Sequence, residues 1–230
     1  MYPWISAVFL MVLCASQHAA AQSNIDPVNC YAWTENLGWI NWRAEAVPDQ
    51  GVVVHGTFLS GFAWAENVGW INFGDGTPVG GTFYSLADGT DAGVNVAPDG
   101  SLFGYAWGEN VGWINFDGGI LAVPPDPARI ECDGRFRGFA WGENFGWINL
   151  SELSPGKFVA VEASFAPLAC DMNHDGAVDG QDIGDFLRLL FTAQTPGWND
   201  VCSGDVEATP DQAIGPGDID AFVACLLGSA

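Results

Sequence analysis

Residues Tyr105–Phe116 read YAWGENVGWINF, and nearly the same twelve residues occur three more times in the chain. The other copies are YAWTENLGWINW at Tyr31–Trp42, FAWAENVGWINF at Phe62–Phe73 and FAWGENFGWINL at Phe139–Leu150. Their spacing is uneven, with an insertion near Gly74–Gly93. Because each copy of such a repeat is usually one supersecondary unit, we number the four units in chain order and argue the fold from them.

Each copy is predicted to form two short strands joined by a tight turn. Its Glu-Asn pair lies between two aromatic, β-prone runs, and a glycine follows two residues later; Asn and Gly both tolerate positive φ. A further β-prone run precedes copies two to four, and Asp-Gly pairs at Asp99 and Asp133 are hairpin signals. Each unit is therefore expected to be a three-strand meander. The preceding runs are Val52–Val54, Val94–Val96 and Arg129–Glu131.

The first unit lacks such a preceding strand, and Lys157–Phe165 (KFVAVEASF) offers a spare one after the fourth unit. Pairing the two would close the units into a ring without open sheet edges. This favours a mainly β fold, either a small propeller or a closed, barrel-like meander, with a two-sheet sandwich as the alternative. Cys30 takes the position that glycine has in the other units, and ring closure would bring it toward Cys132. We therefore expect a Cys30–Cys132 disulfide that closes a long loop.

Every copy carries two tryptophans, and these are either core residues or surface rings that stack on sugars. Each Trp buries a large apolar area, so core packing is the favoured interpretation, and ligand stacking is the functional alternative. The eight residues are Trp33, Trp39, Trp64, Trp70, Trp107, Trp113, Trp141 and Trp147.

One glutamate in each copy raises the question of glycoside hydrolysis, because most glycosidases use a pair of carboxylates. A catalytic pair needs two different environments that separate the two pKa values. Four equivalent Glu-Asn turns instead indicate groups that cap the backbone of four equivalent hairpins. His55 is the only histidine of this region, so a Ser-His-Asp or Cys-His arrangement has no support either. We expect no enzymatic activity. The glutamates are Glu35, Glu66, Glu109 and Glu143.

The charge of the chain is strongly negative, with six Lys+Arg against 28 Asp+Glu and a formal net charge of -22. Such a chain repels phosphate backbones and anionic membrane surfaces, which argues against both as partners. Dense carboxylates attract cations, and outside cells the usual one is Ca²⁺.

The N-terminus has the pattern of a secretory signal peptide. Ile5–Cys14 is a short apolar run, and Ala19–Ala21 offers small residues for cleavage. The run is too short to span a bilayer. We expect a signal peptide over residues 1–21, a secreted or cell-surface mature protein without membrane insertion, and disulfides among the remaining cysteines.

The clearest chemical motif is Cys170–Ile183, which reads CDMNHDGAVDGQDI. Counted from Asp171, its oxygen-bearing side chains fall at the ligand positions of an EF-hand loop, with Gly176 at the sharp bend. Carboxylates this close together repel one another without a cation. We therefore expect the region to become ordered when Ca²⁺ binds. The expected ligands are Asp171, Asn173, Asp175, the Ala177 carbonyl, Asp179 and Asp182.

Helical spacing starts directly after this loop and returns after a second Asp-containing loop. This duplicated loop and helix resembles the type I dockerin module of cellulosomal enzymes and scaffolds, over about Cys170–Gly228. The resemblance implies two antiparallel loop–helix halves that bind Ca²⁺ and dock onto a cohesin of another protein. It places a calcium module at 168–230, after a β-repeat domain at 22–167. The helical positions are Ile183, Phe186, Leu187, Leu190 and Phe191, then Ile219, Phe222, Val223, Leu226 and Leu227.

The second loop departs from this pattern. Counting back from Asp218 places Glu207, Thr209 and Asp211 at the first three ligand positions, whereas a loop that starts at Asp205 would carry a two-residue insertion. Under either alignment we expect a weak metal site or none.

Two further features concern docking and cross-linking. Gly180 and Gln181 take the positions that help dockerins to choose a cohesin, without the familiar Ser/Thr pair. The expected disulfide of this region is Cys202–Cys225.

The sequence thus indicates a secreted, non-enzymatic protein with a Ca²⁺-dependent attachment module for a cohesin-like or cell-surface partner. Its β domain is expected to bind carbohydrate or another partner. Two alternatives stay open, a polysaccharide-degrading enzyme component carried by its dockerin and an inert structural surface protein.

Overall fold

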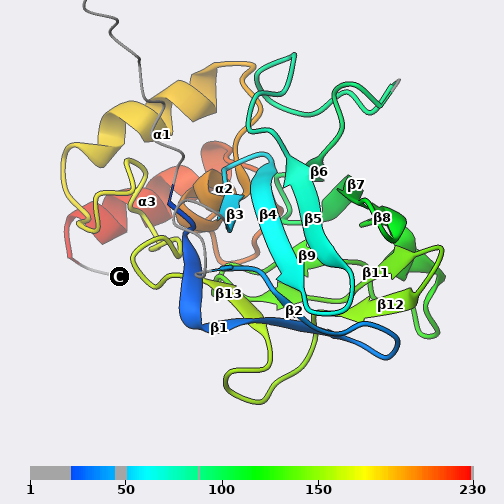
Figure 1. The fold of residues 1–230 in the computed structure, drawn as a ribbon. Helices are drawn as coiled ribbons and strands as arrows, with labels where there is room; N and C mark the ends of the chain where they lie inside the picture. The colour runs from blue at the N-terminus through cyan, green and yellow to red at the C-terminus, as the bar shows by residue number, and fades with distance from the viewer. Residues whose placement is uncertain (1–21, 45–50, 88, 229–230) are drawn as a thin grey trace, which may run out of the picture.

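The computed structural model describes residues 22–44, 51–87 and 89–228, and Figure 1 shows a β-barrel with a small helical region beside it. The expected signal peptide at 1–21 lies outside the described residues. None of the helices within the described ranges is long and apolar enough to cross a membrane.

Two strands from each unit form a closed antiparallel barrel of 8 strands. The pairing order is β1-β2-β4-β5-β7-β8-β11-β12, and β12 pairs back with β1. Closure of the ring is confirmed, in the form of one barrel rather than separate propeller blades or two stacked sheets. The strands are β1 Ile25–Thr34, β2 Gly38–Asn41, β4 Leu59–Ala65, β5 Gly69–Gly74, β7 Leu102–Gly108, β8 Gly112–Asn115, β11 Phe139–Gly142 and β12 Gly146–Asn149.

Short strands extend the meanders as the sequence predicted. β3 (Val52–Val54) pairs with β4, and β6 (Val94–Val96) pairs with β7. β13 (Val159–Val161) supplies the strand that the first unit lacks, because it pairs with β1. In the fourth unit, β9 (Arg129–Ile130) and β10 (Phe136–Arg137) form a hairpin.

The core of the barrel repeats with the sequence. Successive residues of a strand point to opposite faces of the sheet, so Ala and Ile of each copy point inward while both tryptophans point outward. Trp42, Phe73 and Phe116 add a layer of larger rings, with the Trp42 and Phe73 centroids 4.6 Å apart. The inward residues, all between 0% and 3% exposed, are Ala32, Ala63, Ala106, Ala140, Ile40, Ile71, Ile114 and Ile148.

The C-terminal region has its own small core. Phe186 and Phe222 stack at 4.0 Å between α1 and α3, beside Cys170, Met172 and Leu189. α2 belongs instead to the barrel core, because Trp198 is fully buried there and its indole N–H donates to the His55 carbonyl at 3.3 Å. The helices are α1 Asp182–Phe191, α2 Trp198–Gly204 and α3 Ile219–Leu226, with 3-10 turns η1 Gly118–Leu121 and η2 Pro216–Asp218.

Both expected disulfide pairings are wrong. The structure joins Cys132 to Cys202 and Cys170 to Cys225. Cys30 is buried in β1, where β13 rather than the segment around Cys132 lies opposite it. Cys202 lies on α2, which docks on the barrel. Its sulfur therefore lies beside Cys132 rather than beside Cys225 on α3. Two disulfides indicate that the protein folds in an oxidising environment.

Candidate functional site: a tryptophan belt and two acidic loops

The repeated tryptophans lie on the outer surface of the barrel, so the expected core packing is wrong. Seven of the eight side chains are 36% to 44% exposed. Successive side chains of a strand alternate between its two faces, and in each copy the Ala and the Ile take the inward face, so the tryptophans beside them point outward. We call this surface the tryptophan belt; it consists of Trp33, Trp39, Trp64, Trp70, Trp107, Trp113, Trp141 and Trp147.

The two rings of each unit meet edge to face across the hairpin, a favourable geometry for aromatic pairs. Trp107 and Trp113 are directly opposite in the register of β7 and β8, and their centroids are 4.7 Å apart. A third ring, Tyr105 in this unit, packs against the second tryptophan at 6.0 Å. Each ring is thus held in place by its neighbour, with part of its surface left to solvent.

Asparagine side chains tie each hairpin turn to a neighbouring unit. The Glu-Asn turns therefore do cap backbone groups, although the asparagine does so and the glutamate stays exposed. The fourth of these bonds crosses the seam between units one and four and completes a ring. The amide nitrogens donate from Asn67 to the Leu37 carbonyl at 3.0 Å, from Asn110 to Val68 at 2.9 Å, from Asn144 to Val111 at 3.0 Å and from Asn36 to Phe145 at 2.8 Å.

Grooves run between units of the belt. The groove between units two and three has a volume of about 770 Å³ and includes Trp64, Trp70, Trp107 and Glu109. The groove between units four and one, of about 670 Å³, is lined by Trp33, Glu35, Trp147 and the loop that contains Leu121, Val123 and Asp126. Both combine exposed indole surface with carboxylate oxygens, as sites for small polar ligands do.

The first acidic loop folds around two buried carboxylates. Asp171, which is 3% exposed, accepts backbone N–H bonds from Asp175 at 3.2 Å and Gly176 at 2.9 Å. Asp182 is fully buried and accepts N–H bonds from Met172 at 2.7 Å and Asp179 at 2.8 Å. Gly176 has a φ of 86°, as the sharp bend at that position requires.

The second loop has the same plan when it is counted from Asp205. Asp218 accepts N–H bonds from Val206 and Gly215, both at 2.8 Å, as Asp182 does in the first loop. Asp205 accepts them from Asp211 at 3.4 Å and Gln212 at 2.6 Å, as Asp171 does. Gln212 even has a positive φ of 66°, in the place of Gly176. The two-residue insertion, not the count back from Asp218, thus aligns the loops.

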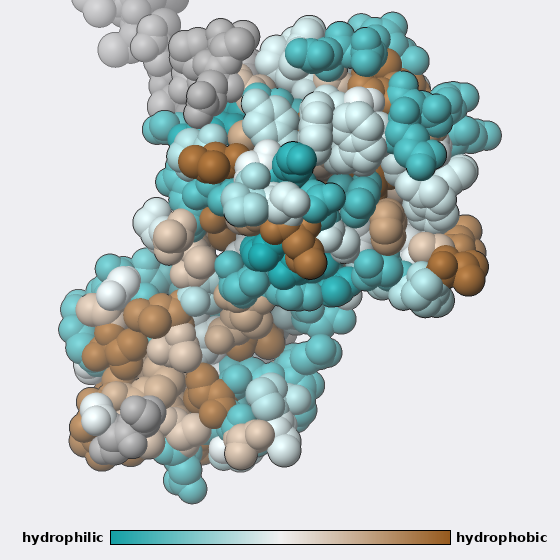
Figure 2. Space-filling view, turned by 90° about the horizontal axis from the view of Figure 1, so that it is seen from below, coloured by the Kyte–Doolittle hydropathy of each residue, from teal (hydrophilic) through white to brown (hydrophobic). Residues whose placement is uncertain are grey.

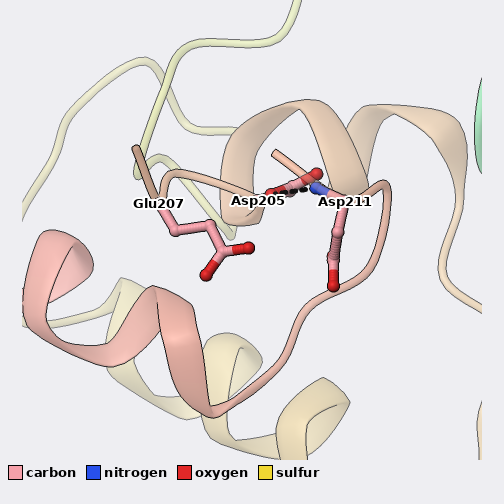
Figure 3. A group of neighbouring side chains, drawn as sticks. All are labelled: Asp205, Glu207 and Asp211. Carbon is pink, nitrogen blue, oxygen red and sulfur yellow. Dashed lines mark hydrogen bonds between the residues drawn. The ribbon is translucent and has the colours of Figure 1, made fainter. Parts of the chain in front are cut away.

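Asp205, Glu207 and Asp211 converge in this second loop (Figure 3). One carboxylate oxygen of each lies within 4.8 Å of the others, an arrangement that could hold a metal ion. Burial and the nearby carboxylates of Asp211, Asp218 and Asp205 raise the pKa of Glu207 above its ordinary value. Thr209 and Asp218, both expected as ligands, are outside this group. Asp205 could have been found from the sequence because it takes the position in the second loop that Asp171 takes in the first.

No protein-family model, curated protein or solved structure matches this chain. Its function is therefore inferred from the tryptophan belt and the acidic loops themselves.

Proposed function

We propose that this chain is a secreted, non-catalytic, carbohydrate-binding protein with a Ca²⁺-binding, dockerin-like attachment module. The observation that carries the proposal is the outward orientation of the belt. A large apolar ring left in solvent forgoes part of its burial energy, and a contiguous exposed apolar surface commonly marks a binding site. The chain repeats this arrangement at four equivalent places.

The belt suits a sugar ring in both shape and chemistry. Indole faces offer flat apolar surface for the C–H faces of a sugar, and groove residues such as Glu109, Asn72 and Asn110 offer polar groups for its hydroxyls. The edge-to-face pairing of Trp64 with Trp70, at 4.9 Å, fixes the rings before a ligand arrives. Such preorganisation lowers the entropy that binding costs.

Equivalence of the glutamates supports a binding role over catalysis. All four occupy the same exposed position of the same hairpin turn. Hydrolysis requires two carboxyl groups with distinct pKa values and roles. The repeat provides four copies of one environment instead.

Attachment is proposed for the face formed by α1 and α3. On α1, Ile183 and Leu187 are each 42% exposed; on α3, the duplicated positions Ile219 and Val223 are 39% and 45% exposed. Figure 2 shows apolar side chains gathered over the helical region, at the lower left of the view. An exposed apolar face of this kind, on a module that resembles a dockerin, supports docking of a cohesin-like or cell-surface protein.

Glycan binding is tested by titrating the protein with soluble oligosaccharides while Trp fluorescence is recorded. We expect saturable quenching that is reduced in Trp107→Ala and kept in Trp42→Phe, which changes a buried tryptophan outside the belt. Assaying the same glycans for hydrolysis tests the enzyme alternative, which product release would favour. Absence of binding across a broad panel would favour an inert structural protein and contradict the proposal.

Calcium binding is tested by calorimetry on chelator-treated protein. We expect heat of binding and a gain of helical circular dichroism. Asp171→Ala should remove the contribution of the first loop and Asp205→Ala that of the second, whereas Asp99→Ala, in a barrel turn, should change neither. No heat and no gain of helix would remove the attachment module from the proposal.

A further inference from the structure

The belt carries charge of only one sign. Each twelve-residue copy contains one glutamate and no other Asp, Glu, Lys, Arg or His. All basic side chains of the Lys and Arg type lie outside the four copies. They are Arg43, Arg129, Arg135, Arg137, Lys157 and Arg188.

The arginines are engaged with groups outside the four copies. Arg43 pairs with Glu162 at 2.6 Å, and Arg129 pairs at 2.7 Å with Asp126, which lines the groove between units four and one. Arg135 lies over the ring of Phe158 at 3.8 Å. Within the part of the chain that the structure describes, no ion pair reaches a belt glutamate. These carboxylates are therefore available to a ligand.

Each of the two large grooves places such a carboxylate beside indole rings. Glu109 shares its groove with Trp64, Trp70 and Trp107, and Glu35 shares the other with Trp33. An ammonium group close to an indole face is attracted by the ring's negative face even at an exposed site. A nearby carboxylate adds to this attraction, and the net charge of -22 attracts cations from a distance. Carboxylate or sulfate groups on a ligand are instead repelled by these glutamates and by the net negative charge.

We propose that the glycan bound by the tryptophan belt is a polymer of amino sugars that carry free, protonated amines. This inference rests on the carbohydrate-binding function proposed above. The apolar face of each sugar stacks on an indole, and its ammonium group lies at the glutamate of the same groove. Polymers of uronic acids or sulfated sugars are excluded by charge.

The test is calorimetric titration of the intact, Ca²⁺-loaded protein with four oligosaccharides of equal length. These are glucosamine, N-acetylglucosamine, glucose and glucuronic acid oligomers, and oligolysine of the same charge serves as a fifth probe. We expect the glucosamine oligomer to bind about tenfold more tightly than the N-acetylated and glucose oligomers, with an advantage that falls as salt rises. Glucuronic acid oligomers and oligolysine should bind more weakly still.

Matched variants locate the effect. Glu109→Gln together with Glu35→Gln should reduce the preference for glucosamine, whereas Asp220→Asn, an exposed carboxylate on α3, should leave it unchanged. Equal binding of the neutral and amine-bearing oligomers would overturn this inference and leave the carbohydrate-binding proposal intact. Binding of oligolysine as tightly as the glucosamine oligomer would also overturn this inference, because the sugar would then contribute nothing beyond its charge. Failure of every oligosaccharide to bind would overturn the carbohydrate-binding proposal itself.

Discussion

The barrel and the C-terminal region are both built from repeats, yet they are stabilised in different ways. The four units of the barrel share one large core, pair their strands around a closed ring and exchange a ring of asparagine bonds. The two halves of the C-terminal region share five buried residues and the Cys170–Cys225 disulfide. A small core of this size needs cross-links or metal ions, whereas a closed barrel of this size does not.

The barrel and the C-terminal region also differ in how they use their carboxylates. In the barrel, the repeated glutamates point into solvent one at a time. In the C-terminal region, Asp182 and Asp218 are 0% and 1% exposed and hold loop amides together, while Asp205 and Glu207 converge nearby. The barrel thus leaves its repeated charge exposed to solvent, and the C-terminal region uses much of its own to shape the loops.

The largest effect should come from the disulfide of the C-terminal region. Cys170→Ser combined with Cys225→Ser removes a cross-link with a sequence separation of 55 residues. The loop-entropy model predicts a loss of about 4 kcal/mol. Thermal melting should show helical circular dichroism lost at a lower temperature, while the Trp signal of the barrel keeps its transition. A single shared transition in the variant would contradict the separation of the two cores.

The barrel should instead depend on its repeated isoleucines. Ile114→Ala and Ile71→Ala each leave a cavity in the closed core, where both side chains are no more than 1% exposed. We expect each to cost about 3 kcal/mol in urea unfolding, with the two values within about 1 kcal/mol of each other. Widely different losses would show that the units are not equivalent in the core.

High pH should lower the free energy of unfolding of the barrel, because Tyr84, in the insertion between units two and three, loses its proton. Burial raises the pKa of Tyr84 from 10.0 to about 12, while its hydroxyl donates to the Leu59 carbonyl at 3.2 Å and accepts the Gly76 N–H at 2.8 Å. The folded state therefore holds this proton more tightly, so the stabilisation is complete below pH 10 and is lost as pH rises toward 12. The loss should approach about 3 kcal/mol.

Urea unfolding at several values of pH measures this loss. Tyr84→Phe should remove most of the dependence over that pH range, and Tyr105→Phe, which changes an exposed ring, should keep it. An unchanged slope in Tyr84→Phe would contradict the assignment.

A smaller effect should follow from breaking the ring of asparagine bonds. Asn67→Ala and Asn36→Ala should each cost about 1 kcal/mol, the usual net value of one hydrogen bond. Asn67→Asp should lose the same bond because a carboxylate cannot donate. Urea unfolding measures all three, and a cost near zero at Asn36 would show that the seam does not need its bond.

The sequence was sufficient for the strands and turns, because the repeat and the glycine positions are local signals. It favoured a closed ring but did not distinguish a propeller, a barrel and a sandwich, and the ring closes by pairing of β12 with β1 rather than through the spare strand at Lys157–Phe165. The sequence could not decide which face of each hairpin is buried. Ala and Ile alternate with Trp, and both faces are apolar, so the pattern does not say which of the two faces the closed barrel turns inward. The disulfides depend on where α2 docks, which no local pattern encodes. The first acidic loop supplied the template that places Asp205 correctly.

The central claim is that the tryptophan belt is an outward-facing glycan-binding surface. Hydroxyl-radical footprinting with mass spectrometry, done with and without a glucosamine oligomer, tests it at each tryptophan. We predict oxidation of Trp64, Trp70 and Trp107 in the free protein and their protection by the oligomer, while Trp42 and Trp198 stay unoxidised in both. Belt tryptophans that resist oxidation in the free protein, or that oxidise equally with the oligomer bound, would contradict the account.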